Sequence, residues 1–476
     1  MNAIRLAATT SVVLVVALLS VTAAAGKPPG PAMNVACSQQ ALVDAINAAN
    51  SAGGGTLDLA RGCDYQLTSS PDDSENGLPP ITSPITIDGN DATIDGTGSF
   101  RDVEVDGPGG ALSARDLTIT GGFAQDFGGG IANIGGAVTL QHTQVTGNSA
   151  GSAGGGIANA TFDPSSPATL TLDHSSVSDN QQRFGPDNEN ALGGGGIVNV
   201  LGTVTLDHSQ VNGNDAEGFV GGGIASGDYF GFADSGSVLT LDHSQVNGNT
   251  APNAGGGGIQ NLLGTATLSH SQVDGNTSRN GGGITSGNAN GGSAGPAELR
   301  LSHSEVNGNT ATAGPGEGPP IAAGGIANGS IAVLDHSQVD GNNAPNGAAA
   351  GIINHGTLSL DHSEVNGNTA PSSGLAGSGG GIFNSPSGPG TGILTLDHSK
   401  VNGNTAGGFG GGIANGAGPL PGGDVTVTHS EVTRNTAAHG GGIFNNGGTV
   451  SLSDSKVTGN TPDNCEPPGS IAGCTN

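Results

Sequence analysis

The chain has 476 residues, of which 91 are glycine and only 3% are aromatic, and its formal net charge is -28 with 11 Lys plus Arg. So few cations exclude nucleic acid and anionic membranes as partners, because phosphate binding needs clustered Lys and Arg. The glycines come in clusters and not at every third position, which excludes collagen. Apolar residues that recur in register argue against a disordered chain.

The N-terminus has the parts of an export signal. Arg5 gives a positive start, residues 12–21 an apolar segment, and residues 23–25 are the small alanines expected at a cleavage site. The apolar segment is too short to span a bilayer comfortably, and no later stretch is apolar enough. We expect a signal peptide at 1–25, a secreted mature chain and no transmembrane segment.

The four cysteines lie at the two ends of the mature chain, which fits an oxidising compartment: Cys37, Cys63, Cys465 and Cys474. Three pairings are formally possible, but a long body between the two pairs favours the local one. A Cys37–Cys63 bridge closes a loop of about 26 residues, worth roughly 3 kcal/mol.

After a Pro/Gly linker at 26–36, residues 37–80 are expected to form an N-terminal cap. It begins with a short helix over 37–50, capped by Ser38, and continues as a strand at 56–59 and a loop at 69–80. The predicted apolar face of the helix consists of Leu42, Ala45, Ile46 and Ala49.

Short alternating strands are predicted next, and they read as the first, less regular coils of a repeat. They cover 85–90, 92–96, 103–105 and 117–119.

A regular repeat then follows, of which residues 193–214 are one copy. Its Gly-Asn step recurs at intervals of roughly 25 to 36 residues, the range of solenoid repeats. Val204 and Leu206 should point inward, and Val211, out of phase with them, requires a turn at His208. A second turn is expected at Gly213–Asn214, with Asn214 left-handed. Residues 197–199 give a third inward strand.

Three short strands and three turns per unit predict an all-β, right-handed parallel β-helix of about 13 coils over residues 81–460. A lone coil buries too few aliphatic side chains to offset its conformational entropy, so coils must stack and both ends must be covered. The N-terminal helix and a C-terminal cap at 461–476 suit that purpose.

The Gly-Gly-Gly-Ile-x-Asn cluster, followed by Leu-x-x-x-Ser-x-Val-x-Gly-Asn, resembles the polymorphic outer-membrane-protein repeat of bacterial right-handed β-helix proteins. The segment at 37–50 with Ile85 to Gly89 is similar to the start of many secreted members. This resemblance covers nearly all of the mature chain and implies a secreted or surface-exposed scaffold, in some members an adhesin. After Asn460 only a short tail remains, with no room for a translocating barrel.

Stacking should place a histidine of each repeat in one column, made of His142, His174, His208, His243, His270, His303, His336, His362, His398 and His429. Neighbouring imidazoles could bind Zn²⁺ or Cu²⁺. We expect instead a structural ladder, neutral at pH 7 because adjacent imidazolium ions would repel.

Asp-His-Ser recurs in this column but is not expected to be a catalytic triad, because neighbouring side chains around a turn should point apart. The outward carboxylates form two groups, and weak Ca²⁺ binding there is the alternative to a solvated surface. No catalytic residue, cofactor or metal ligand is predicted. The two groups are Asp173, Asp207 and Asp242, then Asp335, Asp361 and Asp397.

Insertions between coils are where a β-helix usually places its binding residues. The one at 226–237 holds the densest aromatic cluster and is the candidate binding loop, with Asp228, Tyr229, Phe230, Phe232 and Asp234. Its rings could stack on a sugar or simply pack on the rod.

The sequence favours a secreted, monomeric, non-catalytic scaffold that binds a polysaccharide or a cell-surface protein. The alternative is a polysaccharide lyase or a glycoside hydrolase. A lyase needs a basic residue to abstract a proton, and the few cations of the repeats are scattered. A hydrolase needs two carboxylates at a defined distance, which the sequence leaves open.

Overall fold

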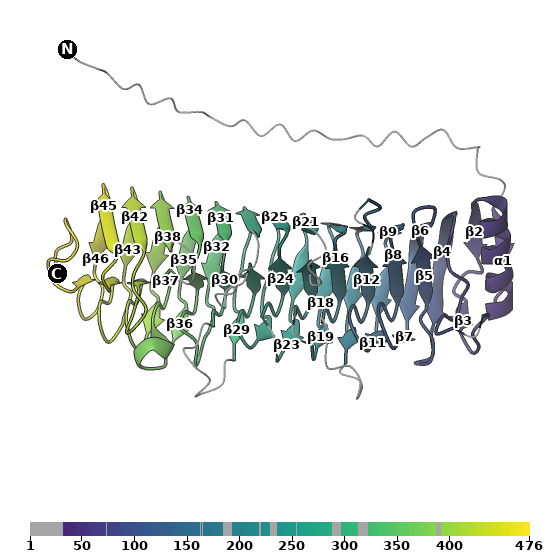
Figure 1. Cartoon of the computed structure of the whole chain (residues 1–476), viewed down its shortest axis with the longest axis horizontal. Coiled ribbons are helices and arrows are strands. Elements are labelled where there is room, and N and C mark those ends of the chain that lie inside the picture. Colours follow the sequence, from purple (N-terminus) through teal and green to yellow (C-terminus); the bar gives the residue numbers. More distant parts are fainter. Residues whose placement is uncertain are drawn as a thin grey trace, which may run out of the picture.

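The computed structural model describes residues 32–72, 74–161, 163, 165–183, 193–218, 220–228, 236–253, 255–287, 297–312, 322–386 and 392–476. It confirms the all-β parallel β-helix: the strands form long parallel sheets that run along a rod, and the one α-helix among these residues lies at one end (Figure 1). A 13-stranded sheet, with one strand from each coil from β5 (Val103–Asp106) to β47 (Cys465–Glu466), matches the predicted number of coils.

One coil shows how the repeat folds. It contains β16 (Ile197–Val200), β17 (Thr203–Asp207), β18 (Gln210–Asn212) and β19 (Asp215–Ala216). The first three are the predicted strands. The fourth was not predicted, because a two-residue strand is too short to show an alternating pattern.

The apolar positions of the repeat fill the interior as predicted. Val204, Leu206, Val211 and Ile197 are fully buried and belong to one apolar cluster that runs from Val35 to Ile471. Each such side chain contributes about 1.5–3 kcal/mol, so the free energy of burial accumulates coil by coil.

The turns differ from the prediction in one respect. His208 adopts a left-handed conformation (φ 46°), which turns the chain between β17 and β18. At the second turn the left-handed residue is Gly213 (φ 67°) and not Asn214. The prediction for Asn214 is wrong because Gly213 takes that conformation without steric cost, which frees the Asn214 side chain to point inward.

Asn214 is buried in a ladder of amides along the interior. Its Nδ2 donates to Asn249 Oδ1 (2.9 Å), and its Oδ1 accepts from the backbone N–H (3.0 Å) and the side chain (3.1 Å) of Asn180. A second buried ladder passes through Asn199, which donates to Ser226 Oγ (3.1 Å). These ladders satisfy turn groups that have no strand partner.

The strands that lead into the histidine column pair in register from coil to coil. They are β9 (Ala137–Gln141), β13 (Thr169–Asp173), β17, β21 (Val238–Asp242), β25 (Thr265–Ser269), β28 (Glu298–Ser302), β31 (Ile331–Asp335), β34 (Thr357–Asp361), β38 (Ile393–Asp397) and β42 (Asp424–Thr428). The next strand in this row, β45 (Thr449–Ser453), is followed by Asp454 in place of a histidine.

The first coils are less regular, as expected. The two strands predicted at 85–90 and 92–96 form one strand, β4 (Pro84–Asp95), which is interrupted by left-handed Asn90 and Asp91. It pairs with β2 (Gly55–Leu59) on one side and with β6 (Ala111–Thr120) on the other.

The N-terminal end is covered by α1 (Gln39–Ala52), whose Ser38 cap accepts a hydrogen bond from the Ala41 N–H. Its buried face contains Val43 in place of the predicted Ala45, which is only half-buried. The Cys37–Cys63 disulfide links the start of this helix to the first coil.

At the other end, the predicted Cys465–Cys474 disulfide is present. It holds a short tail in which Ile471 is buried against the last coil. No helix in the described part of the chain is long and apolar enough to cross a membrane.

Candidate functional site

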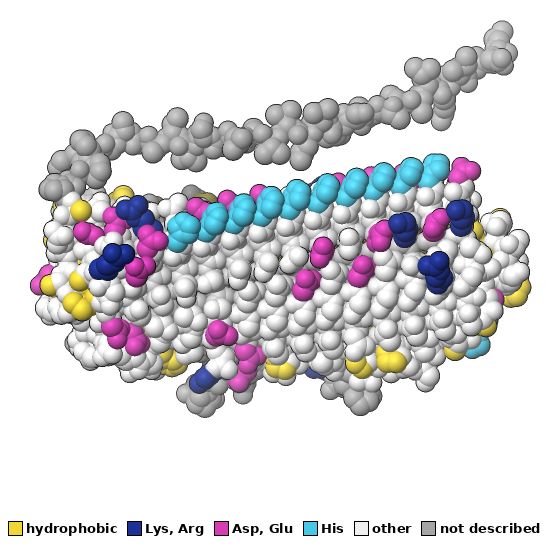
Figure 2. Space-filling view, turned by 180° about the vertical axis from the view of Figure 1, so that it is seen from behind, with side chains coloured by type: hydrophobic (Ala, Val, Ile, Leu, Met, Phe, Trp, Pro, Cys, Tyr) yellow, Lys and Arg dark blue, Asp and Glu magenta, His cyan; other side chains and the backbone are white. Residues whose placement is uncertain are grey.

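The histidine column is the most regular chemical feature of the surface. Each imidazole follows the last residue of one of the strands leading into it, and Figure 2 shows the rings as a continuous row along the rod. Successive ring centroids lie 4.7–5.3 Å apart, and most pairs are stacked. The predicted stacking of the rings is therefore confirmed.

Six of the imidazoles contact the carboxylate of the Asp that precedes them, which corrects the prediction that neighbouring Asp and His side chains point apart. His270 and His303 contact a serine hydroxyl instead. His208 Nδ1 lies 2.6 Å from Asp207 Oδ1, because the left-handed turn at His208 brings the ring back over the preceding residue. An ionised carboxylate only accepts, so Nδ1 carries the proton. In the preceding coil, the hydrogen bond from His174 lowers the pKa of Asp173.

The third residue of the Asp-His-Ser motif lies on the other side of the turn. Ser209 is buried, its Oγ donates to the Asp207 carbonyl (2.7 Å), and it accepts from the Ser175 N–H (3.1 Å). The hydroxyl thus belongs to an internal ladder while the His208 ring is half exposed. The three side chains do not converge as the members of a hydrolase triad must.

The predicted carboxylate groups stack in consecutive coils. Asp173 pairs with Asp207 and Asp207 with Asp242, while Asp361 pairs with both Asp335 and Asp397. Between these groups the same position is occupied by Ser269 and Ser302, and beyond Asp397 by Thr428.

These interruptions change the Asp–His geometry. Where the next coil also supplies an Asp, the Nδ1–Oδ1 distance within a coil is 2.6–2.7 Å. Where the next coil supplies a hydroxyl, the distance lengthens to 3.1 Å at Asp242 and 3.0 Å at Asp397. Asp397 Oδ1 also lies 3.3 Å from Nδ1 of His429 in the following coil. Asp397, which precedes an interruption, is therefore displaced toward the next imidazole.

Desolvation opposes ionisation of Asp397, but hydrogen bonds and charge from His429 and His398 hold its pKa below the ordinary value. In the described residues, three groups place one ligand atom from each of three side chains within 4.8 Å of one another. They are Asp242–His243–His270, Asp361–His362–His398 and Asp397–His398–His429.

A groove of about 340 Å³ lies beside the column in the first regular coils. Imidazoles, hydroxyls and carboxamides line it, so it offers both donors and acceptors of hydrogen bonds. The lining residues are His142, Thr143, Gln144, His174, Ser175, Ser176, His208 and Gln210. The sequence pattern did not predict this groove, because Gln144 and Gln210 come together only through the coil-to-coil register.

The predicted binding loop is only partly described. Asp228 is buried. Tyr229, Phe230, Phe232 and Asp234 lie outside the described residues.

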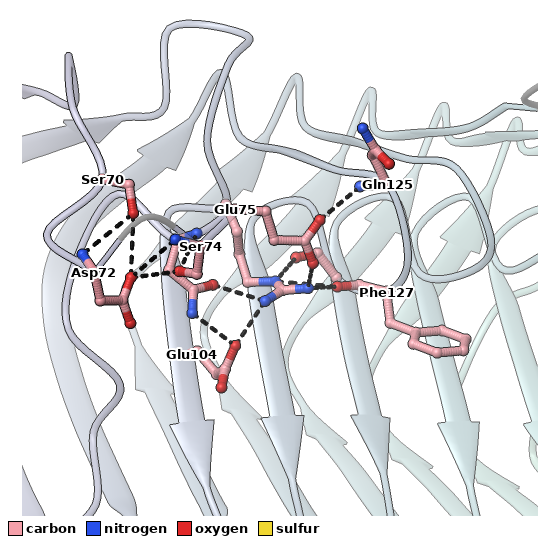
Figure 3. Close-up of polar contacts among 10 residues, drawn as sticks. Ser70, Asp72, Ser74, Glu75, Glu104, Gln125 and Phe127 are labelled. Carbon is pink, nitrogen blue, oxygen red and sulfur yellow. Dashed lines mark hydrogen bonds and ion pairs between the residues drawn. The ribbon is translucent and has the colours of Figure 1, made fainter.

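A second charged cluster surrounds Arg101 at the N-terminal end (Figure 3). The guanidinium pairs with Glu75 and with Glu104 (2.6 Å) and donates to the Phe127 carbonyl (2.9 Å), while Glu75 accepts from the Gln125 N–H (2.9 Å). The Arg101 side chain is only 7% exposed. These contacts fasten the loop at 69–80 to the first coils, which makes the cluster structural.

Comparisons of the chain with protein-family models, with curated proteins and with solved structures find no match.

Proposed function

We propose that the protein is a secreted, non-catalytic β-helix scaffold of the polymorphic outer-membrane-protein repeat type, which binds a glycan or a protein through the polar face beside its histidine column. One observation carries the proposal. A His returns in ten successive coils with ring centroids 4.7–5.3 Å apart, and an Asp precedes it in six of them, as a surface for an extended ligand requires. An active site instead needs different groups that converge on one point.

Several cations of the described coils are held by carboxylates, which favours binding over lyase chemistry. Arg115 pairs with Asp88, Lys400 with Glu364 (2.8 Å) and Lys456 with Glu431 (3.0 Å). A lyase base must be free to accept a proton from the sugar, and a charged side chain held by a carboxylate is a poor base.

The chemistry of the groove favours a neutral glycan as the ligand. Imidazole, hydroxyl and carboxamide groups match the alternating donors and acceptors of a sugar, whereas the net charge of -28 repels polyanions. Two disulfides and the N-terminal signal pattern support an extracellular location.

A binding and turnover experiment tests the proposal. The purified chain should bind members of a panel of neutral polysaccharides without releasing products, with or without Ca²⁺. Replacing Gln144 and Gln210 with Ala should weaken binding at least tenfold, because both side chains line the groove. Gln40→Ala is the matched control, because Gln40 is an exposed glutamine on α1, outside the repeated coils. Product formation that a single Asp→Asn change abolishes would contradict the proposal.

A further inference from the structure

Two of the three clusters of one Asp and two imidazoles lie where the carboxylate column is interrupted. The first involves Asp242, His243 and His270, because Ser269 stands where the next Asp would be. The second involves Asp397, His398 and His429, because Thr428 takes that position. Elsewhere in the described column each Asp sits close to the imidazole of its own coil, at 2.6–2.7 Å.

We propose that these two clusters are binding sites for a divalent transition-metal ion of the zinc class. Each supplies two imidazole nitrogens and one carboxylate oxygen, the ligand set that suits Zn²⁺, Cu²⁺ and Ni²⁺. Ca²⁺ takes six to eight oxygen ligands, and one carboxylate with two imidazoles is a poor match for it. The proposal concerns the metal alone and does not depend on a glycan ligand.

The distances at the second cluster fit a small tetrahedral ion. Metal–ligand bonds of about 2.0–2.1 Å place neighbouring ligand atoms about 3.3 Å apart. Asp397 Oδ1 lies 3.0 Å from His398 Nδ1 and 3.3 Å from His429 Nδ1. The two nitrogens lie within 4.8 Å of each other, and a small rotation of the exposed rings closes that gap.

All three side chains of the second cluster are 46–49% exposed, so an ion reaches them from solvent and water completes its coordination. Binding requires no net loss of protons from the two imidazoles. The proton on each Nδ1 leaves that nitrogen, and Nε2 takes one up, so each imidazole stays neutral.

The third cluster shares His398 with the second, so one imidazole cannot serve both. In the third cluster Asp361 stays 2.7 Å from His362, whereas Asp397 is displaced toward the next coil. His398 therefore belongs to the Asp397 site, and the chain should bind two ions.

Isothermal titration with Zn²⁺ tests the proposal on the full chain, prepared without a polyhistidine tag and treated with a chelator. Two ions should bind per chain, while Ca²⁺ under the same conditions should give no heat. Co²⁺ should give the intense visible absorption of a tetrahedral site. A chain that binds no Zn²⁺ would overturn the proposal.

The double variant Asp242→Asn, Asp397→Asn should bind Zn²⁺ at least tenfold more weakly at both sites, because each cluster loses its carboxylate. The matched control is the double variant Asp207→Asn, Asp335→Asn. These two residues contact the imidazoles of their own coils at 2.6–2.7 Å, so this variant should still bind Zn²⁺ at both sites. Thermal melting of each variant checks that it folds. If both double variants lose the same amount of Zn²⁺ affinity, or if the chain binds one ion for every histidine pair, the interruptions do not define the sites.

Discussion

At the scale of single residues, one half-buried column accepts Asn or Asp in the same structural position. Asp340 Oδ1 accepts from the Asn366 N–H (2.8 Å), as Asn307 Oδ1 accepts from the Asp340 N–H (3.0 Å). The amide is neutral and the carboxylate is not. Burial and the nearby Glu364 and Glu305 raise the pKa of Asp340 from 3.8 to about 6.

Replacing Asp340 with Asn should therefore stabilise the protein in a pH-dependent way. Because the folded pKa lies above the unfolded one, the protonated carboxyl favours folding below pH 4, and this contribution is lost as the pH rises through 6. The variant should match the natural chain at pH 3.5 and be more stable by about 1 kcal/mol at pH 8, after discounting for solvent screening. Urea denaturation at the two pH values measures this.

The reverse substitution, Asn307→Asp, provides the matched test. It places a carboxylate in the same column one coil away and should lower stability at pH 8 but not at pH 3.5. If Asp340→Asn raises the free energy of unfolding by the same amount at both pH values, the charge of Asp340 is not the cause.

At the scale of the coil, internal amide ladders do as much to define the fold as the aliphatic core. Asn249 accepts from the backbone and side chain of Asn214 and donates to Val211 O and Asn276 Oδ1, all at 2.9–3.0 Å. Asn249 is completely buried, so water cannot take the place of these hydrogen-bond partners.

Asn249→Ala should lower the free energy of unfolding by about 3 kcal/mol, since several buried donors and acceptors lose their partner at once. Asn253→Ala is the control, because Asn253 is exposed and its side chain donates to the Glu217 carbonyl at the surface. Its effect should stay within about 0.5 kcal/mol. Similar denaturation midpoints for the two variants would contradict a structural role for the ladder.

How much of a coil the sequence predicts depends on whether a residue's role is local. The two-residue alternation predicts inward Val204 and Leu206, and the break before Val211 predicts the turn at His208. The fourth strand and the inward position of Asn214 are not predicted, because neither produces a local sequence pattern. The displacement of Asp397 is not predicted either, because it depends on Thr428 in the next coil. Insertions of varied length separate such equivalent residues in the sequence, so their contact is not visible there.

At the scale of the whole molecule, the rod grows by stacking, and its ends are the only coils without a neighbour on one side. The edge groups of β45 and of β46 (Lys456–Thr458) lie at the C-terminal end, and both strands pair with one neighbour only. The tail held by the Cys465–Cys474 disulfide packs against this end, where Asn476 Oδ1 accepts from the Cys465 N–H (2.8 Å).

Detaching this tail should make the protein self-associate, because the unpaired strand edges of an uncovered coil can pair with strands of another chain. Ile471→Asp tests this, since a charge at a side chain only 2% exposed forces the tail off the last coil. The variant should form dimers and larger species at concentrations where the natural chain is monomeric, as light scattering after size-exclusion chromatography measures. Ser470→Asp adds the same charge at an exposed neighbour and should leave the monomer unchanged. A monomeric Ile471→Asp variant with an unchanged melting temperature would show that the tail does not protect this end.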